Sequence, residues 1–354
     1  MLNSARELLC SGRDSMHQAR LKGTYYEMGY QQGEMMKRKT LPSTWLQSFG
    51  EKVNPARKDF ANKSEGIVGQ FMPEFLDELR GISDAVGIDY DIVKIWPLCL
   101  YAKLQQSCSA VAISGEHTAQ RKPLFVRNYD FLDADGKDFT AFWTKPKSGY
   151  SSLGFTDAMS GRYCGFNKKG LAVASSVTGY AGSTQPGITS NLVTRWILDH
   201  YATTGEAVEF LRKVPHFHGW NFLLCDTNNN IVRVETCPER VEVIGFAEGI
   251  GYITNHYMSE EMQKLEEKDW RSSGSTVKRQ ANILDWFRNR NGLINVDYAC
   301  MLARSRVDEG GLCDRFVGVE GGTLWSWTYA IGESNVLVSD GPPCKCAYQT
   351  IHAL

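Results

Sequence analysis

The sequence lacks a surplus of charge of either sign. It has 39 Lys and Arg against 40 Asp and Glu in 354 residues, a formal net charge of −1, and no block of like charge. Proteins that bind nucleic acid concentrate Lys and Arg on one face. The sequence therefore predicts no nucleic acid among the partners of this protein.

Long hydrophobic runs are also missing. No stretch approaches the roughly 18 apolar residues that would predict a transmembrane helix. The first residues, MLNSARE, lack the charged and then apolar pattern of a secretory signal peptide. We therefore expect a cytoplasmic protein with no membrane partner, and its length is enough for one large domain or two smaller ones.

Several common catalytic motifs are absent as well. The chain contains no G-x-S-x-G, no G-x-x-x-x-G-K-[ST], no G-x-G-x-x-G and no H-E-x-x-H. The nearest approach to a metal site is Cys344-x-Cys346 with His352, and this group lacks a fourth ligand. We therefore expect no bound metal and no cofactor.

Ten cysteines are the unusual feature of the composition. A disulfide framework is typical of short secreted chains, whereas this chain is long and shows no export signal. No C-x-x-C spacing is present. We expect most of these cysteines to be small buried hydrophobic residues, with one or two of them reactive.

The first hundred residues have the periodicity of helices. Between Phe75 and Val86, apolar residues recur at spacings of three and four, with Pro73 near the start and Gly87 after the end. This pattern predicts an amphipathic helix with fitting termini. A second apolar helical stretch is expected at residues 92–104.

From Cys108 onward the pattern changes to short strands. The small and β-rich run at 108–114 and the run at 124–131 predict a first hairpin. Further elements are expected in this order: a strand pair around 167–170, a helix around 192–197, a helix that begins with the capping box at Thr203 and continues to about 214, and a strand pair around 226–230. This order favours an antiparallel α+β fold, because parallel strands need helical crossovers.

Cys108, at the head of the first expected strand, is a candidate nucleophile. A thiol needs a base or a lowered pKa to attack at neutral pH, and no Cys-His signature surrounds this residue. If the Ser107–Cys108 bond were cut, however, the new α-amino group of Cys108 would have a pKa near 8 and could act as the base. Such a site needs no histidine.

Six short segments, taken in order, carry a family resemblance. They are GTYYEMGYQQG at 23–33, ELRGI at 78–82, SCS at 107–109, RNYDF at 127–131, GFNKKGL at 165–171 and TNH at 254–256. Together they resemble the N-terminal-nucleophile (Ntn) cysteine amidohydrolases. Among these, the chain is most similar to the isopenicillin N acyltransferase (acyl-CoA:6-aminopenicillanate acyltransferase) family, with penicillin V acylases and bile-salt (choloylglycine) hydrolases as more distant relatives. The resemblance extends from about residue 20 to 340.

The resemblance implies a fold and a maturation step. The expected fold is α+β, the four-layer αββα sandwich of Ntn hydrolases, preceded by a helical N-terminal prosegment. Autocatalytic cleavage between Ser107 and Cys108 would divide the chain into a mainly helical small chain, 1–107, and a catalytic domain, 108–354. The two chains are expected to remain associated, and a homo-oligomer is possible.

The resemblance also implies roles for individual residues. Cys108 is the nucleophile and its freed amine is the general base. Asp130 orients that amine, whereas Arg127 stabilises the thiolate or holds substrate. Asn255 supplies the amide of the oxyanion hole, where one donor is typically worth roughly 3 kcal/mol. Arg315 falls near a late functional arginine of the family and is the candidate for substrate binding.

The function expected from these residues is cleavage of an amide C–N bond in a small molecule through a Cys108 thioester. Either water or an amine resolves the thioester, so the protein is an amidohydrolase or an acyltransferase, with acyl-CoA as a possible acyl donor. Hydrolase substrates would be N-acyl amino acids, amino-acyl amines or β-lactam side chains. The alternative is an unprocessed, catalytically silent relative that binds a ligand or partner, since Ser107 stands where the penicillin acyltransferase has glycine.

Several of these residues also have a purely structural interpretation. Arg127 and Asp130 can form a solvated ion pair, and Asn255 can be a turn residue. Asn167 is interpreted as a hairpin-turn residue. Further structural assignments are a surface or pocket lining for His216 and His218, strand packing for the aromatic run at 325–329, and no second oxyanion side chain near 177–178.

Overall fold

Two β-sheets lie face to face at the centre of the computed structural model, which describes residues 16–38, 54–99, 107–132, 139–156, 160–318 and 320–354. The first sheet has six antiparallel strands. Their order is β11 (Ile250–Ile253), β2 (Ser107–Ile113), β3 (Leu124–Leu132), β12 (Gly321–Ala330), β13 (Asn335–Ser339) and β14 (Tyr348–His352).

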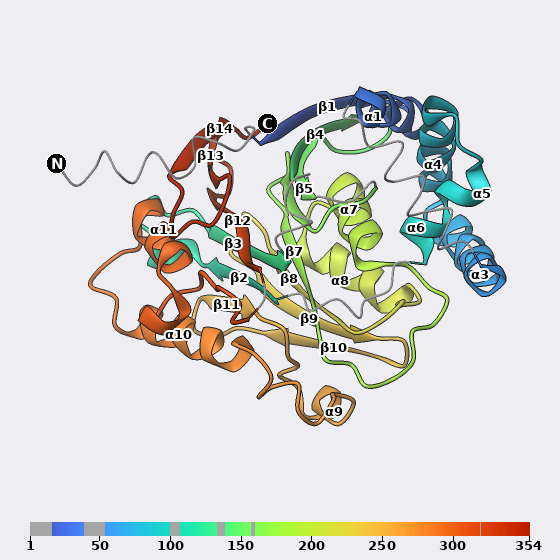
Figure 1. The fold of residues 1–354 in the computed structure, drawn as a ribbon. Helices are drawn as coiled ribbons and strands as arrows, with labels where there is room; N and C mark the ends of the chain where they lie inside the picture. The colour runs from blue at the N-terminus through green and yellow to red at the C-terminus, as the bar shows by residue number, and fades with distance from the viewer. Residues whose placement is uncertain (1–15, 39–53, 100–106, 133–138, 157–159, 319) are drawn as a thin grey trace.

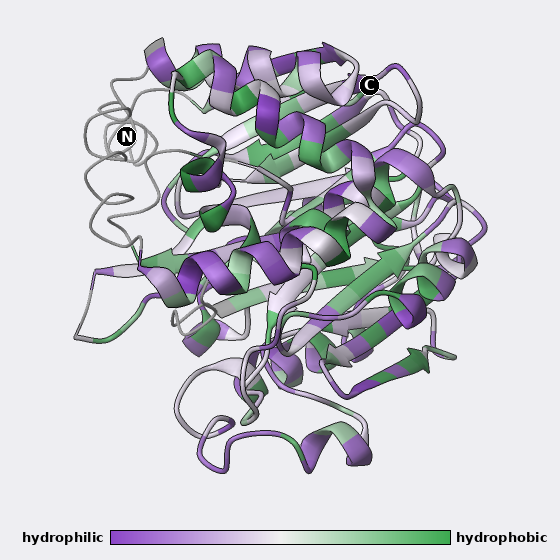
Figure 2. Cartoon of the chain, turned by 90° about the vertical axis from the view of Figure 1, so that its right-hand side faces the viewer, coloured by the Kyte–Doolittle hydropathy of each residue, from purple (hydrophilic) through white to green (hydrophobic). Residues whose placement is uncertain are grey.

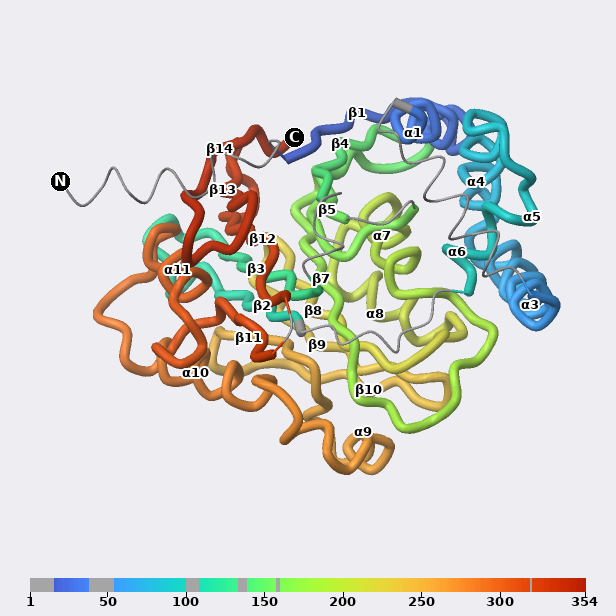
Figure 3. Tube along the Cα trace, viewed as in Figure 1, coloured from blue at the N-terminus to red at the C-terminus, as the bar shows by residue number. Residues whose placement is uncertain are grey.

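The second sheet has eight strands, and its first strand comes from the N-terminal segment. The order is β1 (His17–Gly23), β4 (Thr140–Pro146), β5 (Ser152–Thr156), β6 (Cys164–Asn167), β7 (Ala172–Val177), β8 (Trp220–Cys225), β9 (Ile231–Cys237) and β10 (Arg240–Gly245). β1 pairs with β4 in parallel, whereas the other pairs are antiparallel. Figure 3 shows β1 running beside β4 at the edge of the sheet.

Helices cover the outer face of each sheet (Figure 1). The eight-stranded sheet is covered by α7 (Ser190–His200) and α8 (Thr204–Lys213), and the six-stranded sheet by α10 (Thr276–Arg288) and α11 (Val296–Arg304). The N-terminal segment adds α1 (Tyr25–Arg38), α3 (Pro55–Phe71), α4 (Pro73–Val86), α5 (Tyr90–Val93) and α6 (Ile95–Leu98). The remaining elements are the short helix α9 (Glu260–Gln263) and the 3₁₀ turns η2 (Gly115–His117) and η4 (Val307–Glu309).

Three apolar cores separate these layers. One core lies between the two sheets, a second between the eight-stranded sheet and its helices, and a third between the six-stranded sheet and α10 and α11. The central strands β2 and β3 are buried on both faces, and β3 is buried although it carries Arg127, Asn128 and Asp130 among its apolar residues. Figure 2 shows the helices banded with hydrophilic and hydrophobic residues and the strands mostly hydrophobic. The four-layer αββα sandwich is therefore confirmed.

The helices α1 and α4 of the N-terminal segment pack backbone against backbone. A Cβ atom on Gly29 would lie 2.0 Å from the carbonyl oxygen of Glu78, and one on Gly81 would lie 2.1 Å from that of Tyr26. Only glycine allows such an approach. Gly29 and Gly81 are thus explained by helix packing.

A buried polar cluster joins this helix pair to α7. The hydroxyl of Tyr25 donates to Asp199 Oδ2 at 2.8 Å, and Arg195 Nε donates to the same oxygen at 2.6 Å. Arg195 Nη2 also lies 3.6 Å from Glu78 Oε2, and neither side chain is exposed. Charges buried in this way are kept in place by each other, because an unpaired buried charge is strongly destabilising.

Most of the expected elements are present. The first hairpin is β2 and β3, the helix with Pro73 and Gly87 is α4, and Thr203 forms the capping box of α8 with Glu206. The strand pairs around 167–170 and 226–230 are β6–β7 and β8–β9.

The expected helical stretch at 92–104 is helical in most of its described part, but it is interrupted at Lys94. Its described part contains the end of α5 and the short α6, and residues 100–106 lie outside the described ranges. Pro97 has no N–H to bond the carbonyl four residues earlier, which accounts for the interruption. In the described part of the chain, no helix combines the length and apolarity needed to cross a bilayer. The division at 107/108 stays a prediction.

Candidate active site

Cys108 is the second residue of β2, and its side chain faces the other sheet. It belongs to the apolar core between the sheets together with Ala110 and Ala112, as the two-residue period of a strand requires. The residue is 1% exposed, and burial raises the pKa of its thiol above the usual range. The nearby guanidinium of Arg127 acts in the opposite direction. In the uncut chain this thiol is therefore held largely protonated.

Arg127 lies on β3 and faces the same inter-sheet layer. It is 1% exposed, and its guanidinium interacts electrostatically with the thiols of Cys108 and Cys164. Its Nε and Nη1 atoms have no hydrogen-bond partner among the described residues. A buried guanidinium with free donors beside a thiol can stabilise a thiolate or a carbonyl oxygen of a bound substrate.

Asp130, three residues further along β3, lies on the opposite face of the sheet. Its Oδ1 accepts a hydrogen bond from the Thr323 hydroxyl at 2.6 Å, and its Oδ2 lies 3.9 Å from Arg279 Nη1. Burial, reinforced by the nearby Asp314, raises the pKa of Asp130 to about 7, and Arg279 and Thr323 only partly oppose this. Arg127 and Asp130 are both fully buried, so the interpretation as a solvated ion pair is wrong.

Asn255 binds the backbone nitrogen of Cys108, which is the atom that cleavage would turn into the α-amine. Its Oδ1 accepts from this N–H at 2.7 Å, and its Nδ2 donates to the carbonyl oxygen of Val177 at 2.9 Å. Its own N–H donates to Thr276 Oγ1 at 2.8 Å. The Asn255 side chain is therefore fixed between the end of β7 and the start of β2.

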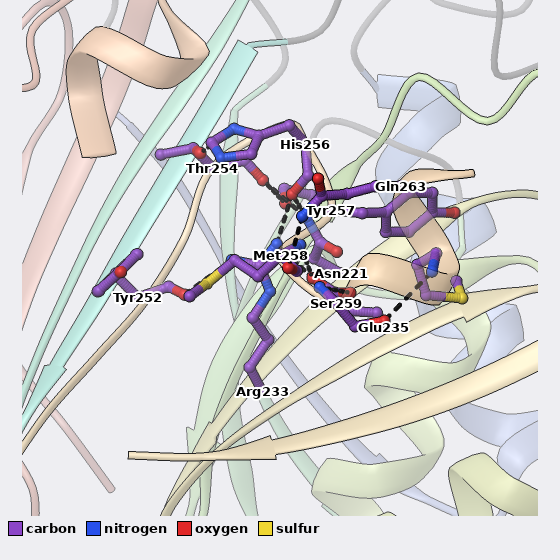
Figure 4. A network of polar contacts seen from close by, with 12 residues as sticks. Asn221, Arg233, Glu235, Tyr252, Thr254, His256, Tyr257, Met258, Ser259 and Gln263 are labelled. Carbon is purple, nitrogen blue, oxygen red and sulfur yellow. Dashed lines mark hydrogen bonds and ion pairs between the residues drawn. The ribbon is translucent and has the colours of Figure 1, made fainter. Parts of the chain in front are cut away.

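A buried network holds the turn that carries Asn255 (Figure 4). Arg233 Nη2 lies 2.7 Å from Glu235 Oε1 and also donates to the carbonyl oxygen of His256. Asn221 Nδ2 donates to the carbonyl oxygens of Thr254 and His256 at 3.0 and 3.1 Å. Because β8 and β9 hold the turn on both sides of Asn255, this residue has little freedom to move away from Cys108.

Arg279 is a residue of the site that sequence reasoning missed. From α10 it donates through Nη1 to the carbonyl oxygen of Cys108 at 2.6 Å and to Ser109 Oγ at 2.7 Å. Its Nη2 donates to Asn255 Oδ1 at 2.8 Å. Burial of the side chain is complete. Arg279 therefore links Cys108, Asn255 and, at longer range, Asp130.

A signal for Arg279 was present in the sequence. The buried positions of α10 are Thr276, Arg279, Ile283 and Phe287, which recur at spacings of three and four. An arginine on the apolar stripe of a helix must have buried partners, because an isolated buried charge is very unfavourable. Reading the helical period across α10 would have identified this arginine.

The structure places the other candidates as follows. Ser107 is the first residue of β2 and pairs with Asp130 in register. Arg315 forms an isolated bridge with Gly322 and interacts electrostatically with Cys344. The segment that carries Arg315 meets the site through Thr323, whose Oγ1 accepts from the N–H of Asp314 at 2.8 Å and whose hydroxyl donates to Asp130.

The structural assignments have mixed outcomes. Asn167 is confirmed as a turn residue, since its Oδ1 accepts the N–H groups of Lys169 and Leu171. His216 is buried and its Nε2 is hydrogen-bonded to the carbonyl oxygen of Leu211, so of the two expected places, a surface or a pocket lining, the surface is wrong. The aromatic run at 325–329 packs within β12, as expected. The described residues contain no group of three or more metal-ligating side chains.

The chain is similar to one known protein family. The sequence profile described as "Acyl-coenzyme A:6-aminopenicillanic acid acyl-transferase" matches residues 117–300, just over half of the chain. This stretch includes Arg127, Asp130, Asn255 and Arg279 and begins nine residues after Cys108. A search of curated protein sequences found no match.

Solved structures with a similar fold are distant in sequence. A conjugated bile acid hydrolase from Clostridium perfringens has 13% identity and a TM-score of 0.47, covering 69% of this chain and 92% of that chain. Penicillin V acylase from Agrobacterium tumefaciens has 16% identity and a TM-score of 0.46, covering 69% and 86%. The Caenorhabditis elegans ortholog of N-acylethanolamine-hydrolyzing acid amidase has 13% identity and a TM-score of 0.47, covering 69% and 99%. On the profile match, which spans more than half of its length, the chain belongs to the acyl-coenzyme A:6-aminopenicillanic acid acyl-transferase family.

Proposed function

We propose that the protein is a self-processing Ntn cysteine enzyme that cleaves an amide C–N bond in a small molecule through a thioester on Cys108. One observation carries the proposal. The backbone N–H of Cys108 and its thiol lie in one buried constellation with Asn255, Arg279, Arg127 and Asp130. Membership in the acyltransferase family supports the same chemistry.

The uncut chain is the resting form in this proposal. Its Cys108 nitrogen is an amide, which is no base, and its thiol has a raised pKa. Attack of Cys108 Sγ on the carbonyl carbon of Ser107 breaks the C–N bond between them, and water then releases the acyl group of the first chain. The product has a free α-amine on Cys108, whose ordinary pKa near 8 suits a general base.

Turnover then uses the same atoms on a small substrate. The amine takes the thiol proton while Sγ attacks the acyl carbonyl, and it returns the proton to the leaving amine, which leaves a thioester. Asn255 Oδ1 accepts a hydrogen bond from the Cys108 nitrogen, and Arg279 donates to the same oxygen, so these two side chains position the amine. The Asn255 amide and the free donors of Arg127 are our candidates for stabilising the oxyanion, and Arg315 is our candidate for substrate binding.

Intact mass and N-terminal sequencing of freshly purified protein test the processing step. We expect a 247-residue fragment that begins at Cys108. The variant Cys108→Ala should stay whole and inactive, whereas Cys225→Ala removes another fully buried thiol and should be cut normally. An uncut wild-type chain whose Cys108 resists thiol reagents would contradict the proposal and favour the catalytically silent relative.

The choice between hydrolysis and acyl transfer depends on which nucleophile reaches the thioester. Hydroxylamine or 6-aminopenicillanic acid, added as a competing amine, should divert the acyl group into a new amide or hydroxamate if acceptor amines enter the site. Acyl-CoA is our candidate acyl donor for transfer. Release of free acid alone, at every amine concentration, would indicate a hydrolase.

We further propose that the small and large chains stay associated after cleavage. The contacts that support this are the parallel pairing of β1 with β4 and the buried cluster of Tyr25, Glu78, Arg195 and Asp199. Gel filtration of the processed protein should give one peak that contains both chains. Two separate peaks under native conditions would contradict this.

A further inference from the structure

Cys344 differs in exposure from the other free thiols. Eight free cysteines lie among the described residues, and Cys344 is the one that is not buried. It sits in the turn between β13 and β14, where the N–H groups of Lys345 and Cys346 both donate to the carbonyl oxygen of Pro342 at 2.8 Å. A partly exposed thiol in a hydrogen-bonded turn is accessible to small reagents.

The thiol of Cys344 is hydrogen-bonded to the thiol of Cys313, which is buried. The backbone of Cys313 is fixed on both sides of the peptide unit: its N–H donates to the carbonyl oxygen of Ser305 at 2.9 Å, and its carbonyl oxygen accepts from Val307 at 3.2 Å. The two sulfur atoms are therefore adjacent and presented from two hydrogen-bonded segments that are distant in sequence.

The surroundings shift the pKa values of the two thiols in opposite directions. The hydrogen bond from Cys313, together with the cations Arg315 and Lys345, lowers the pKa of Cys344. The same hydrogen bond, and burial, raise the pKa of Cys313. The other groups that interact electrostatically with the pair are Arg306 near Cys344, and Asp130 and Tyr348 near Cys313.

We propose that Cys344 and Cys313 form a redox modification site, separate from the Cys108 chemistry, that reacts with hydroperoxides. The Cys344 thiolate attacks one oxygen of the peroxide bond and becomes a sulfenic acid, while the other oxygen leaves as alcohol or water after protonation. The sulfur of Cys313 then attacks the sulfenic sulfur, loses its proton and displaces water, which forms the disulfide. Two thiols are oxidised by two electrons, and one peroxide is reduced.

The positions of the two cysteines fit their roles as the attacking and the resolving thiol. The attacking sulfur is the one that is both partly exposed and surrounded by cations, and the resolving sulfur is in contact with it from the buried side. The disulfide would join the turn before β14 to the segment 306–315. This segment reaches the Cys108 site through Asp314 and Thr323.

Peptide mapping of the full-length protein tests the proposal. Purified protein is treated with a small molar excess of hydrogen peroxide at pH 7, the remaining thiols are alkylated, and the protein is digested with trypsin. Cys313 falls in the peptide 307–315 and Cys344 in the peptide 316–345, while Cys346 falls in 346–354. Among the peptides that carry Cys313 and Cys344 we expect one new cross-linked species, 307–315 with 316–345, lighter by two hydrogen atoms than the sum of its parts and split by dithiothreitol. Cys346 is already disulfide-bonded, so the peptide 346–354 is cross-linked with or without peroxide and serves as an internal reference.

Two variants provide the controls. Cys344→Ser should abolish the cross-link, and Cys300→Ser, which removes a nearby buried thiol, should leave it unchanged. Without peroxide, iodoacetamide should label Cys344 in the folded wild-type protein at least tenfold faster than Cys313. Recovery of 307–315 fully alkylated after peroxide treatment, or a cross-link of 316–345 to any peptide other than 307–315, would overturn the proposal. The mapping reads these peptides directly, so its result does not depend on whether Cys108 is active.

Discussion

Replacing Asp130 by Asn should change how the stability of the chain depends on pH. Asp130 is fully buried, its Oδ2 accepts no hydrogen bond among the described residues, and its ion-pair partner Arg279 lies 3.9 Å away. The guanidinium of Arg279 instead donates hydrogen bonds to Cys108, Ser109 and Asn255. The desolvation of the carboxylate therefore outweighs the attraction of the guanidinium.

The size of the effect follows from the pKa of this carboxyl group, which is about 7 in the folded chain and near 3.9 in an unfolded chain. Between these values the folded chain binds more protons than the unfolded chain, so Asp130 lowers the free energy of unfolding as the pH rises from about 4 to about 7. A difference of about 3 pH units corresponds to at most about 4 kcal/mol. Asn cannot ionise, so the variant lacks this loss.

The measurement is urea unfolding from pH 4 to pH 8 in a Cys108→Ala background, which we expect to keep the chain uncut. The free energy of unfolding of Asp130→Asn, minus that of the parent, should rise by up to about 4 kcal/mol over this range. Other titrating groups, such as His216 with its pKa lowered to about 4, are present in both proteins and cancel in the difference.

A second variant tests the cause. Thr323→Val removes the hydroxyl that donates to Asp130 Oδ1, so the pKa of Asp130 should rise further and the loss of stability should extend to higher pH. A difference curve for Asp130→Asn that stays flat would refute the reasoning. A curve that falls with pH would mean that Arg279 stabilises the carboxylate more than burial destabilises it.

Three further predictions concern positioning and packing. Arg279→Met should reduce the rates of both self-cleavage and turnover by roughly 30- to 150-fold in single-turnover assays, because charged hydrogen bonds contribute about 2–3 kcal/mol. Lys278→Met, on the exposed side of the same helix, should leave both rates unchanged. Tyr25→Phe should lower the free energy of unfolding by about 1–3 kcal/mol in urea, since a buried carboxylate on α7 loses a donor, and an unchanged midpoint would argue against that hydrogen bond. Gly81→Ala should reduce the melting temperature, whereas Gly66→Ala, where a Cβ atom meets nothing within 4 Å, should raise it slightly; the same sign for both would show that helix propensity, not the contact of α1 with α4, decides.

Local patterns in the sequence predicted those strands and helices that carry their own start, turn or end signals. The capping box at Thr203 and the Pro73 and Gly87 termini of α4 are local signals, and each acts within one turn of the residue that carries it. The strand β1 gave no such signal. His17–Gly23 alternates basic and apolar residues, but its parallel partner β4 lies more than a hundred residues away. Long-range pairing of this kind depends on the completed sheet, which no short window contains.

The residues of the candidate site also fall into those placed by local sequence patterns and those placed by long-range packing. Cys108, Arg127 and Asp130 lie on two paired strands, and their places follow from the register of one hairpin. Asn255 and Arg279 reach the same atoms from a turn and a helix that the sequence places 147 and 171 residues away from Cys108. The opposite facing of Arg127 and Asp130 was implicit in their odd spacing along β3, since side chains alternate in a strand. The family resemblance places the two residues together and does not reveal this difference in direction.

The position of β1 has a consequence for making this protein in the laboratory. Thr140–Pro146, the strand beside it, would become an open sheet edge if the first 107 residues were left out of an expression vector. Unpaired backbone groups along an apolar edge strand are a template for aggregation. Residues 108–354 should therefore be produced within the full chain or co-expressed with residues 1–107, and solubility after refolding should depend on the supply of that one strand.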